Sequence, residues 1–318
     1  MPVNQTRLIW LLIAAMSTLT AVSFALAGLS IDLRSNPFIF PALAVPFAIG
    51  WYYSSMRPDY RLRTVATSAG QLFLILLCGI LLTYAAMATD FPYRDAELYA
   101  IDRFLGFDRQ AYLSFFSSRP WLQSAAGFAY LSFLPQFALV PPLLLFFSDQ
   151  TQRLQILIFA FGGALILTSA ISALVPAVDA FVYVDITPSV FAKISAQLKT
   201  QVPTLEALRS GALHVLRLND LEGLITFPSF HTTGGLLFAW ALLKTPYLRW
   251  PALVINVALI ASTPVVGAHY FIDLVGGAAV AAISLFASQR LYHASARRRP
   301  ATSPDLGILQ QAEENASP

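Results

Sequence analysis

Eight stretches of the chain are mostly apolar and almost free of charge, and several reach the length of a membrane span. They cover about 8–28, 36–55, 65–88, 121–147, 154–176, 229–245, 250–266 and 269–289. Crossing a bilayer as an α-helix takes roughly 20 such residues, and continuous apolar runs of this length indicate helices rather than a closed barrel. The sequence therefore predicts an all-α, polytopic membrane protein with about eight transmembrane helices.

The charged residues of the chain indicate how the spans are oriented in the membrane. They do not indicate a nucleic-acid partner. Only 12% of the 318 residues are charged and the net charge is +3, with the basic residues spread through short loops. If the eight spans alternate, most of these basic residues fall on one side: Arg57, Arg61, Arg63, Arg153, Lys244, Arg249 and residues 297–299. The positive-inside rule then predicts cytoplasmic termini and outward-facing loops at 89–120 and 177–228. An alternative for the first span is cleavage as a signal peptide near residues 24–28.

Both long outer loops contain short amphipathic segments. In residues 96–108, Leu98, Ile101 and Leu105 share one helical face opposite charged residues, which is typical of a helix in the membrane interface. In the second loop, Thr204 is placed to cap a short helix that ends near Gly211.

The last outer turn carries a histidine and an aspartate four residues apart, His269 and Asp273 in GAHYFID. Ionisable residues are costly in membrane segments, so both are candidate functional residues. On a helix this spacing puts them on one face, with Asp273 directed back toward His269. A carboxylate that binds one ring nitrogen leaves the other as a nucleophile or a base. The alternative is that the pair merely satisfies itself near a helix end.

A second motif, PSFH at residues 228–231, opens the predicted span 229–245. Ser229 follows a proline at the helix start, so its hydroxyl is expected either to cap the helix or to bind an oxyanion. His231 falls in the first turn, where unpaired N–H groups and positive potential suit a phosphate. One histidine that attacks phosphorus and another that protonates the leaving oxygen would transfer a phosphoryl group without a metal.

The two motifs resemble those of the type 2 phosphatidic acid phosphatase superfamily in order, spacing and membrane side. That pattern has Pro-Ser-Gly-His, then Ser-Arg, five residues, His, three residues and Asp. This chain has Pro-Ser-Phe-His ending at His231, and Ser-Thr from Ser262 followed by His269 and Asp273 at the same intervals. The resemblance implies His269 as nucleophile, Asp273 as its orienting carboxylate and His231 as acid and base, with no metal or cofactor. FPSFHT and HYFIDLVGG are still more similar to the branch that contains inositolphosphorylceramide and sphingomyelin synthases.

The resemblance also divides the chain. It covers about 65–289, and implies a six-helix catalytic core there that resembles a phosphatidic acid phosphatase. Residues 1–64 would then add two N-terminal transmembrane helices. The polar residues 290–318 are predicted to be a disordered cytoplasmic tail.

Two departures from the family pattern concern phosphate binding. Thr263 stands where the family has an arginine, and the basic motif that precedes Pro-Ser-Gly-His is absent. Arg209 is the expected substitute, with Arg217 second; the alternative is that both contact water or anionic head groups. Because a phosphodiester carries less charge than a phosphomonoester, fewer arginines favour transfer of a diester head group over monoester hydrolysis.

We therefore expect a phosphotransferase or phosphatase whose partners are a membrane lipid with a phosphate head group and, for transfer, a lipid alcohol acceptor. Its site would lie on the extracytoplasmic face of a bacterial cytoplasmic membrane.

Two other functional classes, a zinc enzyme and a transporter or scaffold, are alternatives to this prediction. Two histidines and a carboxylate suit a catalytic zinc ion, although the chain lacks HExxH. A transporter or lipid-binding scaffold would place its polar groups near mid-membrane, whereas here they gather at one surface.

Overall fold

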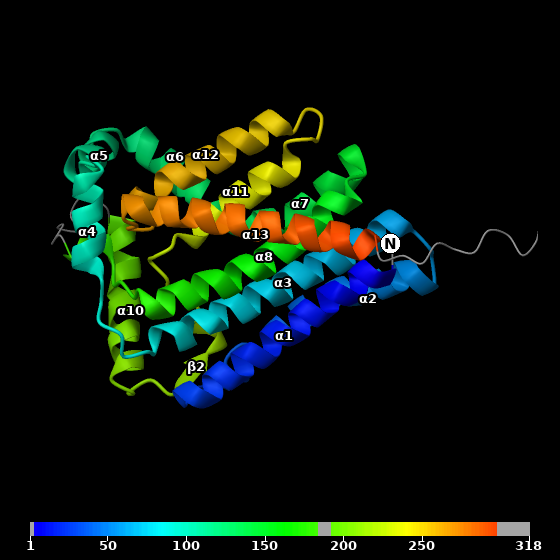
Figure 1. Ribbon diagram of the computed structural model, residues 1–318, viewed down its shortest axis with the longest axis horizontal. Coiled ribbons are helices and arrows are strands. Elements are labelled where there is room, and N and C mark those ends of the chain that lie inside the picture. Colours follow the sequence, from blue (N-terminus) through cyan, green and yellow to red (C-terminus); the bar gives the residue numbers. More distant parts are fainter. Residues whose placement is uncertain (1–2, 184–191, 298–318) are drawn as a thin grey trace, which may run out of the picture.

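The structure, a computed structural model, describes residues 3–183 and 192–297, and nearly all of its regular structure is helical (Figure 1). The helices predicted to cross the membrane are α1 (Val3–Ala27), α2 (Ile39–Ser55), α3 (Tyr60–Met87), α6 (Pro120–Leu131), α7 (Phe133–Ser148), α8 (Thr151–Leu174), α11 (Phe230–Leu242), α12 (Arg249–Val266) and α13 (Phe271–Arg297). All eight predicted apolar stretches are therefore helical. The all-α, multi-pass fold class is confirmed.

Not every predicted stretch is a single long helix. In the described residues, five helices are long and apolar enough to cross a membrane: α1, α3, α8, α12 and α13. The stretch 121–147 is divided into α6 and α7, which bend by 57° and count together as a sixth. Pro135 explains the break, because it cannot donate a hydrogen bond to the carbonyl of Leu131 and its ring crowds that carbonyl.

The remaining two helices are short. Helix α2 has 17 residues and α11 has 13. A 13-residue helix is about 20 Å long, whereas the apolar core of a bilayer is about 30 Å thick. Irregular backbone at membrane depth is tolerated where it lines a cavity, and five residues of the loop before α11 do line one: Leu221, Glu222, Gly223, Ile225 and Thr226.

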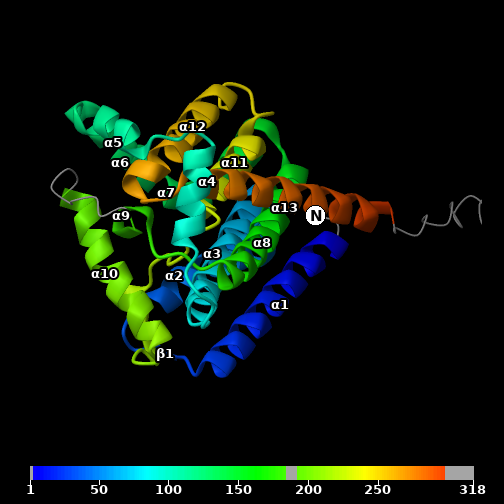
Figure 2. The same cartoon turned by 60° about the vertical axis from the view of Figure 1, so that its left-hand side comes forward.

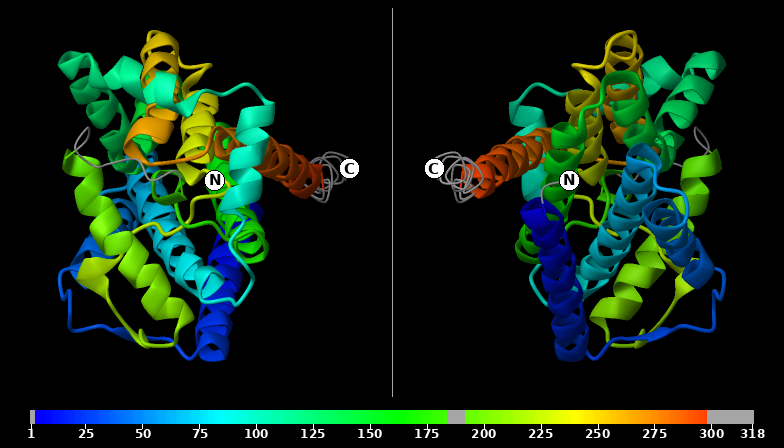
Figure 3. Two further views of the ribbon diagram at one scale, coloured as in Figure 1. Left: turned by 90° about the vertical axis from the view of Figure 1, so that its left-hand side faces the viewer. Right: turned by 90° about the vertical axis from the view of Figure 1, so that its right-hand side faces the viewer.

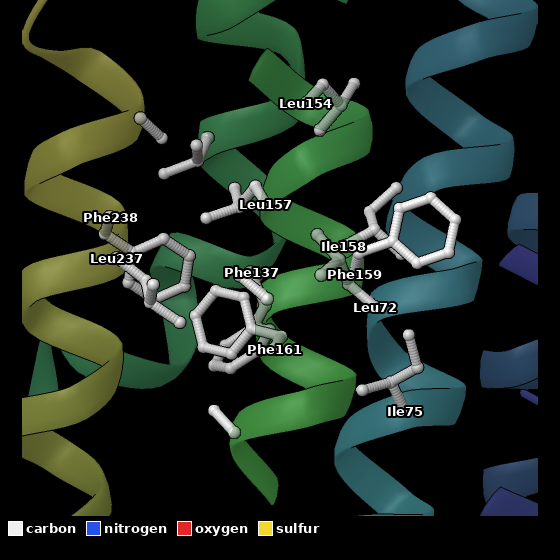
Figure 4. Close-up of a cluster of buried hydrophobic side chains, with 14 of the residues drawn as sticks. Leu72, Ile75, Phe137, Leu154, Leu157, Ile158, Phe159, Phe161, Leu237 and Phe238 are labelled. Atoms are coloured by element: carbon white, nitrogen blue, oxygen red, sulfur yellow. The ribbon is translucent and has the colours of Figure 1, made fainter. Parts of the chain in front are cut away.

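The core of the bundle lies where α3, α7, α8 and α11 meet (Figure 4). Phe137 of α7, Phe161 of α8 and Phe238 of α11 are fully buried, and their ring centroids are 4.8–5.0 Å apart. Helix α1 packs on α3 and α8, and α2 packs on α3. The two N-terminal helices are therefore joined to the same bundle.

Short elements cover one end of the bundle, on the left in Figure 1 and turned forward in Figure 2. They are α4 (Asp95–Phe104), α5 (Arg109–Ser117), α9 (Ala180–Tyr183), α10 (Ala192–Arg209), the 3-10 turn Leu218–Asp220 and two strands. The strands β1 (Ser30–Asp32) and β2 (Val215–Arg217) pair in parallel. Figure 3 shows this end face on, with α4 and α10 lying across it. The N-termini of α11 and α13 open at the same end.

Three local predictions change in the structure. The helix expected to begin at Thr204 is the last part of α10, which ends at Arg209 and is followed by Gly211 with φ of +70°. On α4, Leu98 is buried but Ile101 is 39% exposed, and the other buried side chains are Asp95 and Asp102. The predicted tail 290–318 begins inside α13, which continues to Arg297, and residues 298–318 lie outside the described residues.

Candidate active site

His269 and Asp273 form the hydrogen-bonded pair that their spacing predicts. Nδ1 of His269 lies 3.1 Å from Oδ2 of Asp273. The same oxygen accepts a hydrogen bond of 2.8 Å from the backbone N–H of Tyr270. His269 is 4% exposed and Asp273 is fully buried. Because Nδ1 is engaged, Nε2 is the ring nitrogen left for chemistry.

The turn that carries His269 into α13 is tight. Helix α12 ends at Val266, and at the next residue, Gly267, an added Cβ would lie 2.9 Å from the ring of Tyr130. Ala268 follows with φ of +52°, a left-handed conformation that is unfavourable for a residue with a side chain. Contacts with other elements must therefore hold this turn in place.

His231 lies in the first turn of α11, between aromatic rings. Its ring stacks on Tyr130 with a centroid distance of 4.2 Å, and the ring of Phe133 is 4.7 Å away. Nδ1 of His231 lies 3.4 Å from the hydroxyl oxygen of Tyr130, which makes this a long hydrogen bond. The two aromatic side chains come from the two sides of the α6–α7 break.

Ser229 caps α11, one of the two roles expected for it. Its hydroxyl oxygen accepts a hydrogen bond of 3.3 Å from the backbone N–H of Thr232. Its own backbone N–H donates to the carbonyl of Asp273 at 3.0 Å. An added Cβ at Gly277 would lie only 2.4 Å from the carbonyl oxygen of Ser229, so glycine is required there. These contacts tie the start of α11 directly to the first turns of α13.

The two imidazoles line one cavity of about 340 Å³. The centroids of His231 and His269 are 6.4 Å apart. Hydroxyl, amide and carboxyl groups from α3, α8, α10 and the loop before α11 also line it: Thr83, Thr168, Ser169, Gln201, Glu222 and Thr226. No lysine or arginine is among its lining residues, as far as the structure describes the chain.

The two arginines expected to bind phosphate do not line this cavity. Arg209 donates a hydrogen bond to the carbonyl of Phe91, and its guanidinium lies over the ring of Tyr93 at 4.0 Å. Arg217 lies in β2, 3.9 Å from Asp220, with both side chains largely exposed. Contact between either arginine and phosphate stays a prediction, as does a substrate contact of Ser229.

Sequence reasoning missed the polar groups behind His269. Asp95 of α4 accepts a hydrogen bond of 2.9 Å from the hydroxyl of Tyr270, and Arg109 of α5 donates to the carbonyl of His269 at 2.9 Å. Burial, followed by the nearby charge of Asp95, raises the pKa of Tyr270, so its hydroxyl stays protonated and donates. The sequence does contain one indication of these groups: Asp95 and Asp102 are seven residues apart, which places them on one face of a helix.

Nearby acidic groups are also affected by burial. Burial raises the pKa of Asp179, in the loop before α9, to about 7. The backbone N–H groups of Val178 and Asp179 donate to the carboxylate of Asp95 at 3.0 and 3.2 Å.

In the described part of the chain, no three His, Cys, Asp or Glu side chains are grouped so that they could hold a metal ion.

The fold and the site define a multi-pass membrane protein with a paired-imidazole cavity at one end of its helix bundle. A profile of the PAP2 superfamily matches residues 96–287, which is more than half of the 318-residue chain. The chain belongs to the PAP2 superfamily, and this membership indicates a membrane phosphatase-type enzyme that acts on phosphoric esters. Neither the curated proteins nor the solved structures compared with the chain include a match.

Proposed function

We propose that this protein is a lipid phosphotransferase or phosphatase that works through a phosphohistidine on His269. The observation that carries the proposal is the pair of imidazoles in one cavity, with centroids 6.4 Å apart. Two rings at this separation can both reach one phosphoryl group, because reacting atoms in a near-attack geometry are about 3–3.5 Å apart. The hydrogen bond from His269 to Asp273 supports the assignment of His269 as nucleophile.

The reaction proceeds in two displacements. Nε2 of His269 attacks phosphorus, the bond from phosphorus to the leaving oxygen breaks, and protonated His231 gives its proton to that oxygen. In the second step, water or a lipid alcohol attacks the phosphohistidine, and neutral His231 takes its proton. The bond between phosphorus and His269 breaks, which restores both imidazoles. Asp273 holds His269 in one tautomer and stabilises the positive charge that develops on its ring.

The lining of the cavity supports a lipid substrate and favours a phosphodiester. Leu134 lines the cavity and is 57% exposed, so the cavity has an apolar rim beside the membrane. Apart from the two imidazoles, the only charged side chain in its lining, within the described residues, is the carboxylate of Glu222. A monoester with nearly two negative charges would gain little there, whereas a singly charged diester tolerates such a lining better. Head-group transfer to a lipid alcohol is therefore slightly preferred over hydrolysis.

We place the site on the extracytoplasmic face of the membrane. The basic residues of the chain support this orientation by the positive-inside rule. A cysteine introduced at Ser210 should react with an impermeant thiol reagent on intact cells, while one at Asp59 should not. The reverse labelling pattern would move the site to the cytoplasmic face.

The reaction is tested with purified protein and a panel of phospholipids, with and without ceramide or diacylglycerol, followed by mass spectrometry of the products. A new phospholipid that forms only with an acceptor indicates transfer, and a free head group or phosphate without an acceptor indicates hydrolysis. Activity should survive exhaustive chelation. Activity that is lost on chelation and restored by Zn²⁺ would favour a metal mechanism, and no His269-dependent product from any lipid would contradict the proposal.

A further inference from the structure

Side chains of α4 and α5 hold the backbone of the segment that carries His269. The two carboxylate oxygens of Asp102 accept hydrogen bonds from the backbone N–H groups of Phe271 and Ile272, each at 2.8 Å. Nη2 of Arg109 donates to the carbonyl of His269 at 2.9 Å and lies 3.6 Å from Oδ2 of Asp102. One acidic and one basic side chain thus clamp His269 and the first turn of α13.

This arrangement supplies a cap that α13 lacks in its own sequence. The first N–H groups of a helix have no partner within the helix. Asp273 accepts from the N–H of Tyr270, but it does not reach the N–H groups of the next two residues. Asp102, far away in sequence, takes both, and a carboxylate at this position also interacts favourably with the helix dipole.

The clamp is buried and its charges compensate each other. Asp102 is 2% exposed and Arg109 is 5% exposed. Burial lowers the pKa of Arg109, and the charge of Asp102 opposes this shift most strongly. The guanidinium also lies 5.3 Å from the ring centroid of Tyr270. Removal of one partner would leave the other as an uncompensated buried charge, so the two act as a unit.

Neither clamp residue lines the cavity, so the role of the clamp is distinct from substrate binding. Asp102 and Arg109 are not among the residues that line the cavity of His231 and His269. Their hydrogen bonds to the segment that carries His269 all go to backbone atoms, namely the carbonyl of His269 and the N–H groups of Phe271 and Ile272. This is the backbone that follows Ala268, with its unfavourable φ of +52°.

We propose that Asp102 and Arg109 are positioning residues that hold His269 at attack distance from phosphorus. The proposal rests on the phosphohistidine mechanism above and adds the element that sets its geometry. A misplacement of about 1 Å in a reacting group can cost about 10²-fold in rate. Loss of the clamp should therefore lower the rate constant of the first displacement and leave the affinity for substrate unchanged.

The test is a single-turnover rapid-quench experiment with a nitrophenyl phosphate ester. The amplitude of nitrophenolate release counts the folded sites, and the rate constant reports the attack by His269. Asp102→Asn keeps the shape of the side chain but loses the charge and one acceptor, and should lower the rate constant by about 10²-fold. Arg109→Lys should lower the rate constant less, because an ammonium group retains the positive charge but not the planar set of N–H donors of the guanidinium. The KM should not change in either variant.

Glu97→Gln is the matched control. Glu97 lies on the same helix and pairs with Arg94 at 2.8 Å, but this ion pair is exposed, whereas Asp102 and Arg109 are buried. This variant should keep the wild-type rate constant. Because amplitude and rate are separate, a partly unfolded Asp102→Asn preparation still gives a rate constant for its folded sites.

Two results would overturn the clamp while the mechanism stands. One is a wild-type rate constant in both Asp102→Asn and Arg109→Lys. The other is a lower amplitude with an unchanged rate constant, which would mean a purely structural role. A wild-type protein that releases no more nitrophenolate than His269→Ala would instead overturn the proposed function, and the clamp with it.

Discussion

The two histidines of the site are held in different ways. His269 is fixed by polar contacts: Asp273 holds its ring at 3.1 Å and Arg109 holds its backbone carbonyl at 2.9 Å. His231 is held mainly by aromatic rings, with Tyr130 stacked at 4.2 Å and Phe133 at 4.7 Å. A carboxylate stands behind one imidazole, and aromatic faces stand beside the other.

This difference matches the roles proposed for them. A nucleophile must keep one tautomer and one direction, and it gains positive charge when it forms a bond to phosphorus, so a fixed carboxylate stabilises it. A general acid must both give up and regain a proton. Stacked rings restrict the plane of His231 without pairing its ring with a charged group. The comparison therefore predicts that substitutions at the two sites have different effects on the reaction.

The largest effect is expected at His269. His269→Ala should abolish both turnover and the acid-labile phosphohistidine, because the atom that bonds to phosphorus is absent. The adduct is measured by rapid quenching followed by mass spectrometry of the protein. An adduct of wild-type yield in this variant would remove His269 from the role of nucleophile.

Asp273→Asn should follow, with turnover reduced by up to about 10⁴-fold, the scale for loss of the orienting carboxylate in a catalytic triad. The nucleophile remains, but the amide cannot stabilise its positive charge and allows the other tautomer. The adduct should still form, slowly, in a rapid-quench time course. A variant with wild-type kinetics would reduce the pair to a structural contact near the helix end.

For His231→Ala, the expected loss depends on the leaving group. With a lipid alkoxide, turnover should fall by about 10²–10⁴-fold, the usual contribution of general acid catalysis. With nitrophenolate, which leaves without a proton, the adduct should form at nearly the wild-type rate. The two substrates are compared in single turnovers on the same preparation. Equal losses with both would show that His231 is not the acid.

The smallest effect is expected from the hydroxyl of Tyr130. Its contact with His231 is long, 3.4 Å, and a neutral hydrogen bond contributes about 0.5–1.5 kcal/mol at most, so Tyr130→Phe should change kcat by less than about tenfold. Tyr130→Ala should cost more, because it also removes the stacked ring. Steady-state kinetics of the two variants measure the difference. A larger loss in Tyr130→Phe would mean that the hydroxyl, and not the ring, holds His231.

Several parts of the site could be predicted because they depend on local geometry. The spacing of His269 and Asp273 places them on one helical face, and the structure brings them into contact. The position of Ser229 after a proline indicated a cap, which the structure contains. Such contacts lie within one or two helical turns, so the pattern of residues is enough.

Other parts could not be predicted, because they depend on which elements pack together. Asp102 and Arg109 are charged residues of short helices in a loop, a pattern that is typical of a solvated face, yet both are buried against α13. Arg209 lies near the PSFH motif in the sequence, but its hydrogen bond joins it to the carbonyl of Phe91. A pattern of charges shows that a face is polar, but not whether water or protein satisfies it.

The sequence by itself determined the membrane helices, the order of the two motifs and the partner of His269, because hydrophobic runs and helical spacing act over short stretches of chain. The tertiary structure alone decided that α11 and α13 open into one cavity, that the break at α6–α7 surrounds His231 with aromatic rings, and that α4 caps α13. The contacts of Tyr130 with His231 and of Asp102 with Phe271 join residues that lie more than a hundred positions apart. They are set by the packing of whole helices. This packing brings the buried carboxylate of Asp102 to the N–H groups at the start of α13, which no residue nearby in the sequence satisfies.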